Sequence, residues 1–393
     1  MADDLVASSR PGPLSGLRVL DISCVAPGAF AAMMLGDLGA DVLRVDRAQP
    51  SPEGTGPGTA ERGRDVCHRG RRAIAVDLKK PTGIALVLDL IGRTDVLLEG
   101  FRPGVMERLG LGPEVCLNRN PRLVYGRMTG WGQSGELAHA PGHDINYIAL
   151  AGVLHGLGQP GSRPRPPANL LGDFGGGGML LAFGVACALF ERDRSGQGQV
   201  IDAAMVDGAA LLSTFLHGWL ERGDWCDERG VNLLDGGAPF YDTYETADGR
   251  YLAVGAVEPK FYAELVSRLE IDVDAAQQNN RATWAATRAK MADAFRRRTR
   301  DEWSALLDGT ETCVAPVLTM REAPHHPHNA DRSTFVEVDG YPQPAPAPRF
   351  SRTPAKTPSP PPPTVRRGTE PLIQWQADAA LVHAAIAAGA LAP

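Results

Sequence analysis

The feature that most constrains the fold is a regular alternation of short apolar runs with helical patterns, which begins at Leu17. Residues 17–22 (LRVLDI) and 41–46 (DVLRVD) have the composition of buried strands, and residues 31–39 between them have helical spacing that ends at a glycine. A strand–helix–strand unit of this kind is almost always a right-handed crossover, so the strands are expected to be parallel. The alternation continues in later strands and helices, at 73–78, 82–92, 95–100, 122–130, 173–193 and 199–205. We therefore expect an α/β fold with a Rossmann-like, open parallel sheet and helices on both faces.

A second region has a different pattern. Residues 240–246 and 250–257 flank the turn Ala247-Asp248-Gly249, which predicts a β-hairpin. Helical patterns follow at 260–269 and 284–298, and Thr299 with Glu302 forms a capping box for one more helix. This order of elements predicts a smaller α+β domain.

These patterns divide the chain into four expected segments. A large Rossmann-like domain that binds the ligand spans 1–205, a linker spans 206–235, and the small domain spans 236–335. Residues 336–393 are expected to form a Pro-rich strap, dense in proline from Pro342 to Pro363, and a helical part that returns to the large domain.

Composition excludes several classes of protein. The chain of 393 residues carries a net charge of −6, which argues against a partner nucleic acid. The longest apolar run, Met179–Phe190, is too short to span a bilayer, so we expect no membrane insertion. The N-terminus is polar, the last residues are no peroxisomal signal, and the six cysteines include no CxxC pair. We expect a cytoplasmic protein with free thiols and without a zinc or redox motif.

One glycine motif is a false lead. Residues 130–135 (GWGQSG) match the pattern GxGxxG after a predicted strand. A dinucleotide site also needs a helix that opens at this loop and an acidic residue about 20 positions later. The following residues, ELAHAPG, cannot start a regular helix, so we reject NAD and expect a glycine-rich turn.

His143 is the first candidate site residue. It lies between the Pro141-Gly142 turn and a helix-like stretch, INYIALAGVL. A single histidine is usually structural. At an element edge among polar neighbours, however, it also suits a general base, because its charge changes near neutral pH.

Asp173 is the second candidate. It precedes four successive glycines and a long apolar helix. The plain interpretation is a helix N-cap. Each glycine in a first helical turn costs about 0.5–1 kcal/mol relative to alanine, so we expect a compensating reason, such as the close approach of a ligand to bare backbone. Free N–H groups there would stabilise an anion or an oxyanion.

Glu258 and the cationic residues are weaker candidates. Glu258 precedes Pro259, the expected first residue of a helix, and glutamate is a poor cap. A basic stretch forms either a solvated face or a cradle for phosphates. It comprises Arg62, Arg64, Arg69, Arg71, Arg72, Lys79 and Lys80, with Arg47 and Arg102 at strand ends. The histidines at 325, 326 and 328 lack a set of further ligands, so we expect a surface loop and no metal.

Together these segments resemble a known family. Six stretches carry the likeness, at 15–47, 70–83, 142–147 (GHDINY), 172–178 (GDFGGGG), 196–208 and 232–262. They are similar to the class III CoA-transferase superfamily and, more closely, to its α-methylacyl-CoA racemase branch. The likeness covers about residues 13–335, whereas the first dozen residues and the region 342–370 show little of it.

The resemblance implies a fold, a reaction and a site. The expected enzyme is an isomerase of fatty acid and lipid metabolism, active as two interlocked chains in a homodimer, on a small-molecule acyl-CoA substrate. His143 and Asp173 would be the paired acid and base, and Glu258 would support the histidine, from its own or the partner chain. The coenzyme A part of the substrate would contact Arg47, Val76, Asp77, Leu78, Lys79, Arg102, Gly142, Asp144, Ile145, Asn146 and Tyr147.

The implied chemistry is the inversion of a carbon next to a thioester. One group removes the α-proton from one face and the other returns a proton to the opposite face. The backbone N–H of Asp173 is the expected donor to the enolate oxygen. No cofactor is required, because coenzyme A is part of the substrate. Two rival hypotheses stay open: a CoA-transferase that uses Asp173 as a nucleophile, and a catalytically silent acyl-CoA-binding protein.

Overall fold

The computed structural model describes residues 11–23, 26–48, 65–362 and 369–391. The chain forms two compact units. The first comprises residues 1–151, 168–212 and 331–393, and the second comprises 152–167 and 213–330. The first unit is therefore built from three separate segments of the chain.

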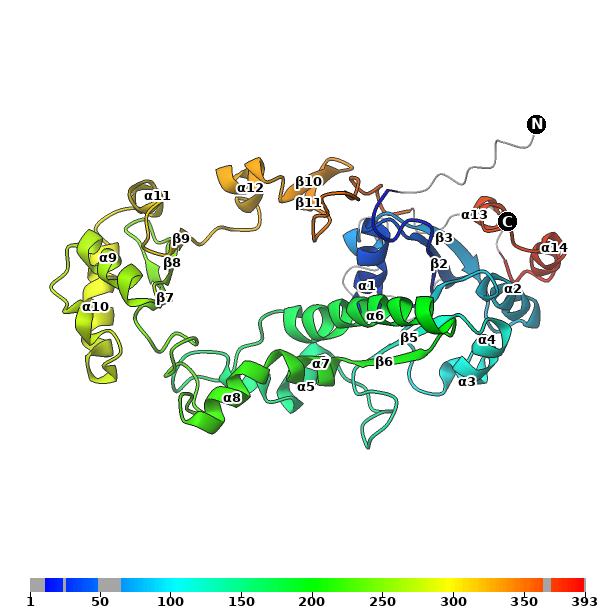
Figure 1. Ribbon diagram of the computed structural model, residues 1–393, viewed down its shortest axis with the longest axis horizontal. Helices are drawn as coiled ribbons and strands as arrows, with labels where there is room; N and C mark the ends of the chain where they lie inside the picture. Colours follow the sequence, from blue (N-terminus) through cyan, green and yellow to red (C-terminus); the bar gives the residue numbers. More distant parts are fainter. Residues whose placement is uncertain (1–10, 24–25, 49–64, 363–368, 392–393) are drawn as a thin grey trace. The chain divides into compact units, whose positions relative to one another are not determined.

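The first unit contains the α/β sheet that the alternating pattern predicts (Figure 1). Its six strands are all parallel and lie in the order β3-β2-β1-β4-β5-β6. They are β1 (Arg18–Asp21), β2 (Asp41–Arg47), β3 (Arg72–Val76), β4 (Val96–Glu99), β5 (Val124–Thr129) and β6 (Val200–Ala204). The order reverses between β1 and β4, and in open α/β sheets ligands bind beyond the carboxyl ends of the strands at such a point.

Helices cover both faces of this sheet. One face carries α1 (Ala26–Asp37) and α6 (Leu180–Ser195), and the other carries α2 (Pro81–Ile91) and the C-terminal helices. The remaining elements of the unit are η2 (Val66–His68), α3 (Val105–Arg108), α4 (Pro113–Arg119), α5 (Asp144–Leu150), η4 (Leu170–Met179), α7 (Met205–Leu212), β10 (Phe335–Val338), β11 (Tyr341–Pro344), α13 (Glu370–Gln374) and α14 (Ala379–Ala387).

The strand sequences supply both hydrophobic cores. Successive strand residues point to opposite faces, so Val19 packs against α1 and α6, whereas Leu20 packs on the side of α2. Both side chains are fully buried. Strands buried on both faces are apolar throughout, which is why the run LRVLDI is recognisable from sequence.

The C-terminal segment returns to the sheet, as expected. Trp375 is fully buried and donates from Nε1 to Asp41 Oδ2 at 3.0 Å. Helix α14 packs on α2, and the N–H of Asp77 donates to the carbonyl of Ala390 at 2.7 Å. The Pro-rich segment is more structured than a simple strap, because β11 pairs with β10 as an antiparallel hairpin.

Two sequence expectations about this region need correction. The expected linker 206–235 is helical over much of its length, since it includes most of α7 and all of α8 (Thr214–Arg222), and the boundary between units falls after Leu212. Residues 152–167 and 213–235 belong to the second unit together with residues 236–330 of the predicted domain 236–335, because the chain re-enters the first unit at Asp331.

The observed helix is longer than the apolar run Met179–Phe190, which was the basis for expecting no membrane span. Elements η4 and α6 are continuous over Leu170–Ser195, 26 residues, which is long and apolar enough to cross a membrane by length and composition alone. A core helix of a globular protein passes the same criterion, and Leu181 and Val185 are fully buried against neighbouring elements of the first unit.

The second unit is the smaller α+β unit. Its sheet has three antiparallel strands in the order β7-β8-β9. Its elements are η3 (Val153–Gly156), α8, β7 (Tyr241–Glu245), β8 (Tyr251–Gly255), α9 (Pro259–Leu269), η5 (Ala275–Gln277), η6 (Arg281–Thr283), α10 (Trp284–Phe295), α11 (Arg300–Leu307), β9 (Val314–Pro316) and η7 (Ala323–His325), with α12 (Pro327–Asp331) at its end. The predicted capping box of Thr299 and Glu302 is present at the start of α11.

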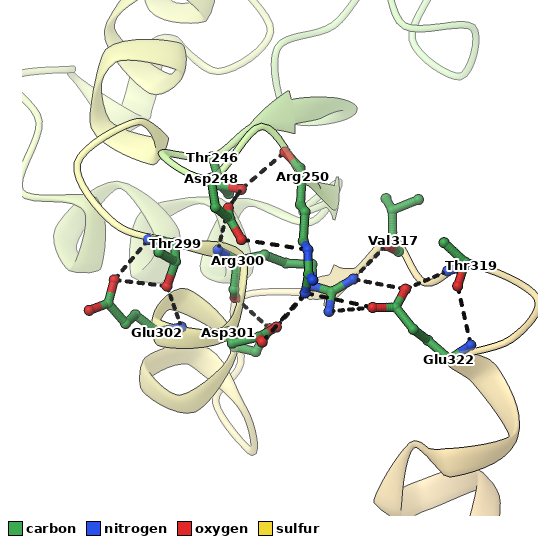
Figure 2. A network of polar contacts seen from close by, with 11 residues as sticks. Thr246, Asp248, Arg250, Thr299, Arg300, Asp301, Glu302, Val317, Thr319 and Glu322 are labelled. Atoms are coloured by element: carbon green, nitrogen blue, oxygen red, sulfur yellow. Dashed lines mark hydrogen bonds and ion pairs between the residues drawn. The ribbon is translucent and has the colours of Figure 1, made fainter.

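A polar network joins three parts of this second unit (Figure 2). Arg300 bonds through both terminal nitrogens to Glu322, at 2.9 and 3.2 Å, and through Nε to Asp301 at 3.0 Å. Its backbone N–H donates to Asp248 in the β7–β8 turn at 3.1 Å. Figure 2 shows the guanidinium of Arg250 beside that of Arg300, between the aspartates and Glu322. The hairpin turn, the start of α11 and the segment after β9 are thereby held together.

Candidate active site

His143 is placed by the turn that precedes α5. It is the N-cap of this helix, and Asn146 Oδ1 accepts from its backbone N–H at 3.0 Å. Tyr147, one turn further on, is buried and packs edge-on against Trp131, with ring centroids 4.7 Å apart. A Cβ on Gly130 or Gly142 would lie 2.1 or 2.7 Å from the tyrosine ring. These glycines therefore let the loop close around Tyr147, and the side chain of His143 is left exposed.

Asp144 connects α5 to the segment that carries Asp173. Its side chain is buried, and its Oδ2 accepts from the backbone N–H groups of Gly172 and Asp173 at 2.6 and 2.7 Å. This arrangement corrects one sequence expectation. The N–H of Asp173, predicted to face an enolate oxygen, is already bonded to a carboxylate of the same chain.

Asp173 does not begin a regular α-helix, which corrects a second expectation. It lies inside η4, a π-helix whose N-cap is Asn169. Asn169 Nδ2 donates to Asp173 Oδ2 at 3.0 Å. Wide π turns are uncommon in proteins and are frequently found at functional sites.

The glycines after Asp173 serve packing between helices. Gly176, Gly177 and Gly178 are buried. A Cβ on Gly176 would lie 2.7 Å from the backbone nitrogen of Ala209 in α7, and one on Gly178 would lie 2.5 Å from the carbonyl oxygen of Pro27 in α1. The cost of these three glycines is therefore offset by the close packing of α1 and α7 against η4, and not by the close approach of a ligand.

The electrostatic setting of Asp173 is distinctive. Burial raises its pKa above the usual value for aspartate, and the charge of Asp144 raises it further, whereas the hydrogen bond from Asn169 and the proximity of His143 lower it. Three other carboxylates have raised pKa values because of burial, at Asp37, Glu99 and Asp242. Each of those three forms an ion pair with an arginine. Among the described residues, no ion pair is formed by Asp173.

The expected coenzyme contacts lie at the carboxyl ends of the strands. Arg47 ends β2 and is exposed, and it stands opposite Val76, the last residue of β3. Lys79, in the loop that follows, is also exposed. Arg102 follows β4 and is exposed, and its charge lowers the pKa of Tyr147 against the larger effects of burial and of Asp173. Arg102 is thus within electrostatic range of the loop that carries His143.

The loop after β3 has other functions besides a coenzyme contact. Asp77 Oδ1 accepts from the N–H of Lys79 at 3.0 Å, and Leu78 packs on the core beside α2. Lys80 Nζ donates to the carbonyls of Ala388 and Gly389, at 2.8 and 3.0 Å, and so holds the C-terminal tail. Ile145, in contrast, projects from α5 and is exposed.

Most of the basic stretch is neither a solvated face nor a cradle. Arg69 is buried and forms two bonds to Asp37, at 2.6 and 3.2 Å, and Arg71 is buried against Asp21 at 2.6 Å. Arg72 pairs with Asp41. Arg62 and Arg64 lie outside the described residues, as does Cys24. Of the described cationic residues in this set, Arg47, Lys79 and Arg102 remain exposed.

Glu258 belongs to the second unit. It is the N-cap of α9, directly before Pro259, and its exposed side chain makes no capping hydrogen bond. The local prediction of a poor cap is confirmed. Its charge contributes to a raised pKa of the Cys313 thiol, which is otherwise raised by burial.

Sequence reasoning missed Asn169 and the true contact of Asp144. The available signal for Asn169 was its position, since asparagine is a favoured N-cap and precedes Asp173 by four residues. No local pattern indicated that the carboxylate of Asp144 points to a segment 28 residues away.

Comparison with known proteins agrees with this architecture. Residues 14–368 match the family described as CoA-transferase family III. The chain is 49% identical over 345 residues to mouse alpha-methylacyl-CoA racemase, which covers 87% of each chain, and 48% identical over 354 residues to the human protein, which covers 87% of this chain and 90% of that one. A crystal structure of a CAIB/BAIF family protein from Brucella suis superposes with a TM-score of 0.80 at 25% identity, and covers 93% of this chain and all of that one. The chain belongs to CoA-transferase family III.

Proposed function

We propose that this protein is a 2-methylacyl-CoA racemase, which interconverts the (2R) and (2S) thioesters by 1,1-proton transfer through an enolate. The observation that carries the proposal is the pair His143 and Asp173, which lie on two elements joined by the buried carboxylate of Asp144. The chain that holds this pair is about half identical to racemases. Asp173 supports it further, because a carboxylate with a raised pKa and no ion pair is suited to hold and release a proton.

The proposed reaction uses each group once per turnover. In one direction a neutral His143 removes the α-proton, the electron pair moves into the thioester carbonyl, and protonated Asp173 delivers its proton to the opposite face of the carbon. In the other direction Asp173 is the base and His143 the acid. Each turnover leaves the two groups with exchanged protonation states, which solvent resets. Positioned proton transfer of this kind typically contributes 10²–10⁴-fold. The carbonyl itself accepts the electron pair, so the step needs no redox cofactor.

Coenzyme A would lie along the carboxyl ends of the strands. Arg47 and Arg102 are exposed there, and arginine binds phosphate oxygens in a bidentate manner. Residues 76–79 and the loop 142–147 border the same edge and would contact the rest of the coenzyme. The acyl chain would then reach the α5 and η4 segments.

We also propose a homodimer in the cytoplasm. Four apolar side chains of α6 and α7 are exposed on the first unit, namely Phe183, Phe190, Leu211 and Leu212, and exposed large apolar side chains of this kind favour burial by a second copy. Glu258, contributed by either chain, would then orient His143. The described cysteines are free thiols, which suits a reducing compartment. Sedimentation as a single species at the 41.8 kDa chain mass would contradict the dimer.

The alternative is a CoA-transferase in which Asp173 attacks the thioester carbonyl. A mixed anhydride would form as CoA thiolate leaves, and attack of the thiolate on the Asp173 carbonyl would then release the donor acid and leave a thioester of Asp173 with CoA. An acceptor carboxylate would displace the thiolate to form a second mixed anhydride, and attack of the thiolate on the acceptor carbonyl would give the new acyl-CoA and regenerate Asp173. This mechanism has no need for a second proton-transfer group at His143, which is why we favour the racemase.

One assay separates the two reactions. The protein is incubated with one enantiomer of a 2-methylacyl-CoA in D₂O without an acceptor acid. We expect inversion by chiral analysis, together with one deuterium at the α-carbon by mass spectrometry. Absence of exchange, followed by CoA transfer once a free carboxylic acid is added, would establish the transferase. Absence of both reactions would leave a binding protein.

A further inference from the structure

Asp144 makes an unusual contact for the first residue of a helix. It directly follows His143, yet its side chain turns away from α5 and is only 6% exposed. One oxygen, Oδ2, accepts both backbone N–H groups of Gly172 and Asp173. The other, Oδ1, is buried and has no hydrogen-bond partner among the described residues. The carboxylate of Asp144 thus links the segment that carries His143 to the backbone of Asp173.

This contact depends on Gly172. A Cβ at that position would lie 2.5 Å from Asp144 Oδ2, closer than real Cβ atoms approach an oxygen. Asp173 is then held at both ends, because Asp144 accepts from its amide and Asn169 donates to its carboxylate. The side chain of Phe174 adds an edge-on contact with Phe30 of α1, with centroids 5.0 Å apart.

We propose that Asp144 is a positioning residue of the reaction, which fixes the separation between His143 and Asp173 through its bonds to the Gly172 and Asp173 amides. This inference rests on the proposed racemase function. A reaction that passes a proton to each face of one carbon requires two groups at a fixed separation, and a displacement of about 1 Å can reduce a rate about 100-fold. Charge-assisted bonds to a buried carboxylate are among the strongest hydrogen bonds that a protein offers for this purpose.

Asp144 also has an electrostatic effect on the same neighbour. Its charge raises the pKa of Asp173 in addition to burial. The charged and titratable groups on the elements packed against η4 include His143, Asp144 and Tyr147 of the α5 segment, Asp207 on α7, Asp202 on β6, Asp37 on α1, which is paired with Arg69, and Arg127 on β5, which is paired with Glu99 and Glu107; Arg102 follows β4. The pKa of Asp173 is shifted first by burial and by the hydrogen bond from Asn169; of the charged groups, Asp144 raises it and His143 lowers it.

Three variants separate the geometric effect from the effect of charge. Asp144→Asn keeps an oxygen that can accept both amides, because a carboxamide oxygen has two lone pairs, but it removes the charge. Asp144→Ala removes both bonds. Gly172→Ala keeps the charge but prevents the close approach. Asp378→Ala is the matched control, because Asp378 also accepts two backbone amides, those of Ala380 and Leu381, at the start of α14.

The activity of each variant is compared with that of wild type by deuterium incorporation at the α-carbon of each 2-methylacyl-CoA enantiomer across pH. The contact itself is measured by amide hydrogen exchange of the peptide that contains Gly172 and Asp173. We expect Asp144→Ala and Gly172→Ala to lose about 100-fold in kcat, with KM within about threefold, and to expose the two amides. Asp144→Asn should stay within about tenfold of wild type at its optimum, with protected amides and with the limb of the pH profile that reports Asp173 moved to lower pH.

The outcomes distinguish this inference from the function on which it rests. Absence of exchange by wild type refutes the racemase, and the amide protection still reports the contact. With an active wild type, the inference is overturned if Asp144→Ala matches Asp378→Ala, if Gly172→Ala retains full rate, or if Asp144→Asn loses as much as Asp144→Ala. A rise in KM without loss of kcat would instead make Asp144 a coenzyme contact.

Discussion

The carboxylates of Asp173, in the first unit, and Glu322, in the second, have polar neighbours that differ in charge, and their pKa values are shifted in opposite directions. Glu322 accepts from Arg300 and Thr319, and these contacts lower its pKa to about 2 (Figure 2). Asp173 accepts from the neutral side chain of Asn169, lies near the negative charge of Asp144, and has a raised pKa. A carboxylate that is fully paired with cations is fixed in its charged state and holds structure. One that is buried without such a partner remains able to exchange a proton.

The comparison is tested most strongly by removing each charge in turn. Asp173→Asn should lower the rate of inversion at the α-carbon by at least about 10³-fold with acyl-CoA binding retained, because a proton-transfer group is lost. Glu322→Gln should leave the rate per folded molecule unchanged. Chiral analysis of the product and equilibrium binding of the thioester measure the two properties. Retention of most activity in Asp173→Asn would contradict the assignment.

The network of the second unit should be essential to stability rather than to turnover. Arg300 is buried, and its replacement by leucine leaves Glu322 and Asp301 with only the longer ion pairs to Arg250, at 3.6 Å each. We expect the free energy of unfolding to fall, because the buried guanidinium of Arg300 also bonds to the carbonyl of Val317 and to Glu322. Urea titration gives the value, and the exposed ion pair of Arg222 with Asp224 offers a control in Arg222→Leu. Equal stability of the two variants would contradict a structural role for the network.

The strand-end arginines should affect substrate affinity alone. Arg47→Ala and Arg102→Ala are each expected to raise KM by about tenfold, the effect of losing one to two kcal/mol of phosphate contact, with kcat little changed. Steady-state kinetics with acyl-CoA measures both constants. An unchanged KM in both variants would place the phosphates elsewhere on the chain.

The smallest expected effect is on Tm at neutral pH, which Glu322→Gln and Asp173→Asn should change in opposite directions. The folded pKa of Glu322 lies below the unfolded value of about 4.3, so its contribution is present above that pH and is lost as pH falls toward about 2. The folded pKa of Asp173 lies above the unfolded value of about 3.9, so its contribution is present below that pH and is lost as pH rises through the folded value. At neutral pH, Glu322→Gln should therefore lower Tm and Asp173→Asn should raise it. Thermal unfolding of both variants at pH 7 measures the two changes in Tm, and two changes of the same sign would contradict the comparison.

Features carried by local pattern could be predicted from the sequence. The six strands, the hairpin around Ala247-Asp248-Gly249, the position of His143 between a turn and a helix, and the capping box at Thr299 all depend on residues within a few positions of each other. The family resemblance predicted a likeness over about residues 13–335, and the match to CoA-transferase family III extends further, over residues 14–368.

Features set by distant packing could not be predicted. Arg69 and Arg71 are paired with aspartates 32 and 50 residues earlier, so composition alone could not distinguish them from phosphate ligands. The π-helix around Asp173 depends on α1 and α7, which come from either side of it in the chain, and its glycines are explained only by those neighbours. The contact of Asp144 with Gly172 and Asp173 spans 28 and 29 residues.

The central claim is that two groups act on opposite faces of one carbon, and crossed exchange tests it most directly. The variants His143→Ala and Asp173→Asn are incubated separately with the (2R) and (2S) thioesters in D₂O, and deuterium incorporation without inversion is followed by mass and chiral analysis. The account predicts that each variant still exchanges the proton of the one enantiomer whose base it retains, and that the two variants prefer opposite enantiomers. Equal loss for both enantiomers in both variants would contradict a two-base site in which His143 and Asp173 each serve one face.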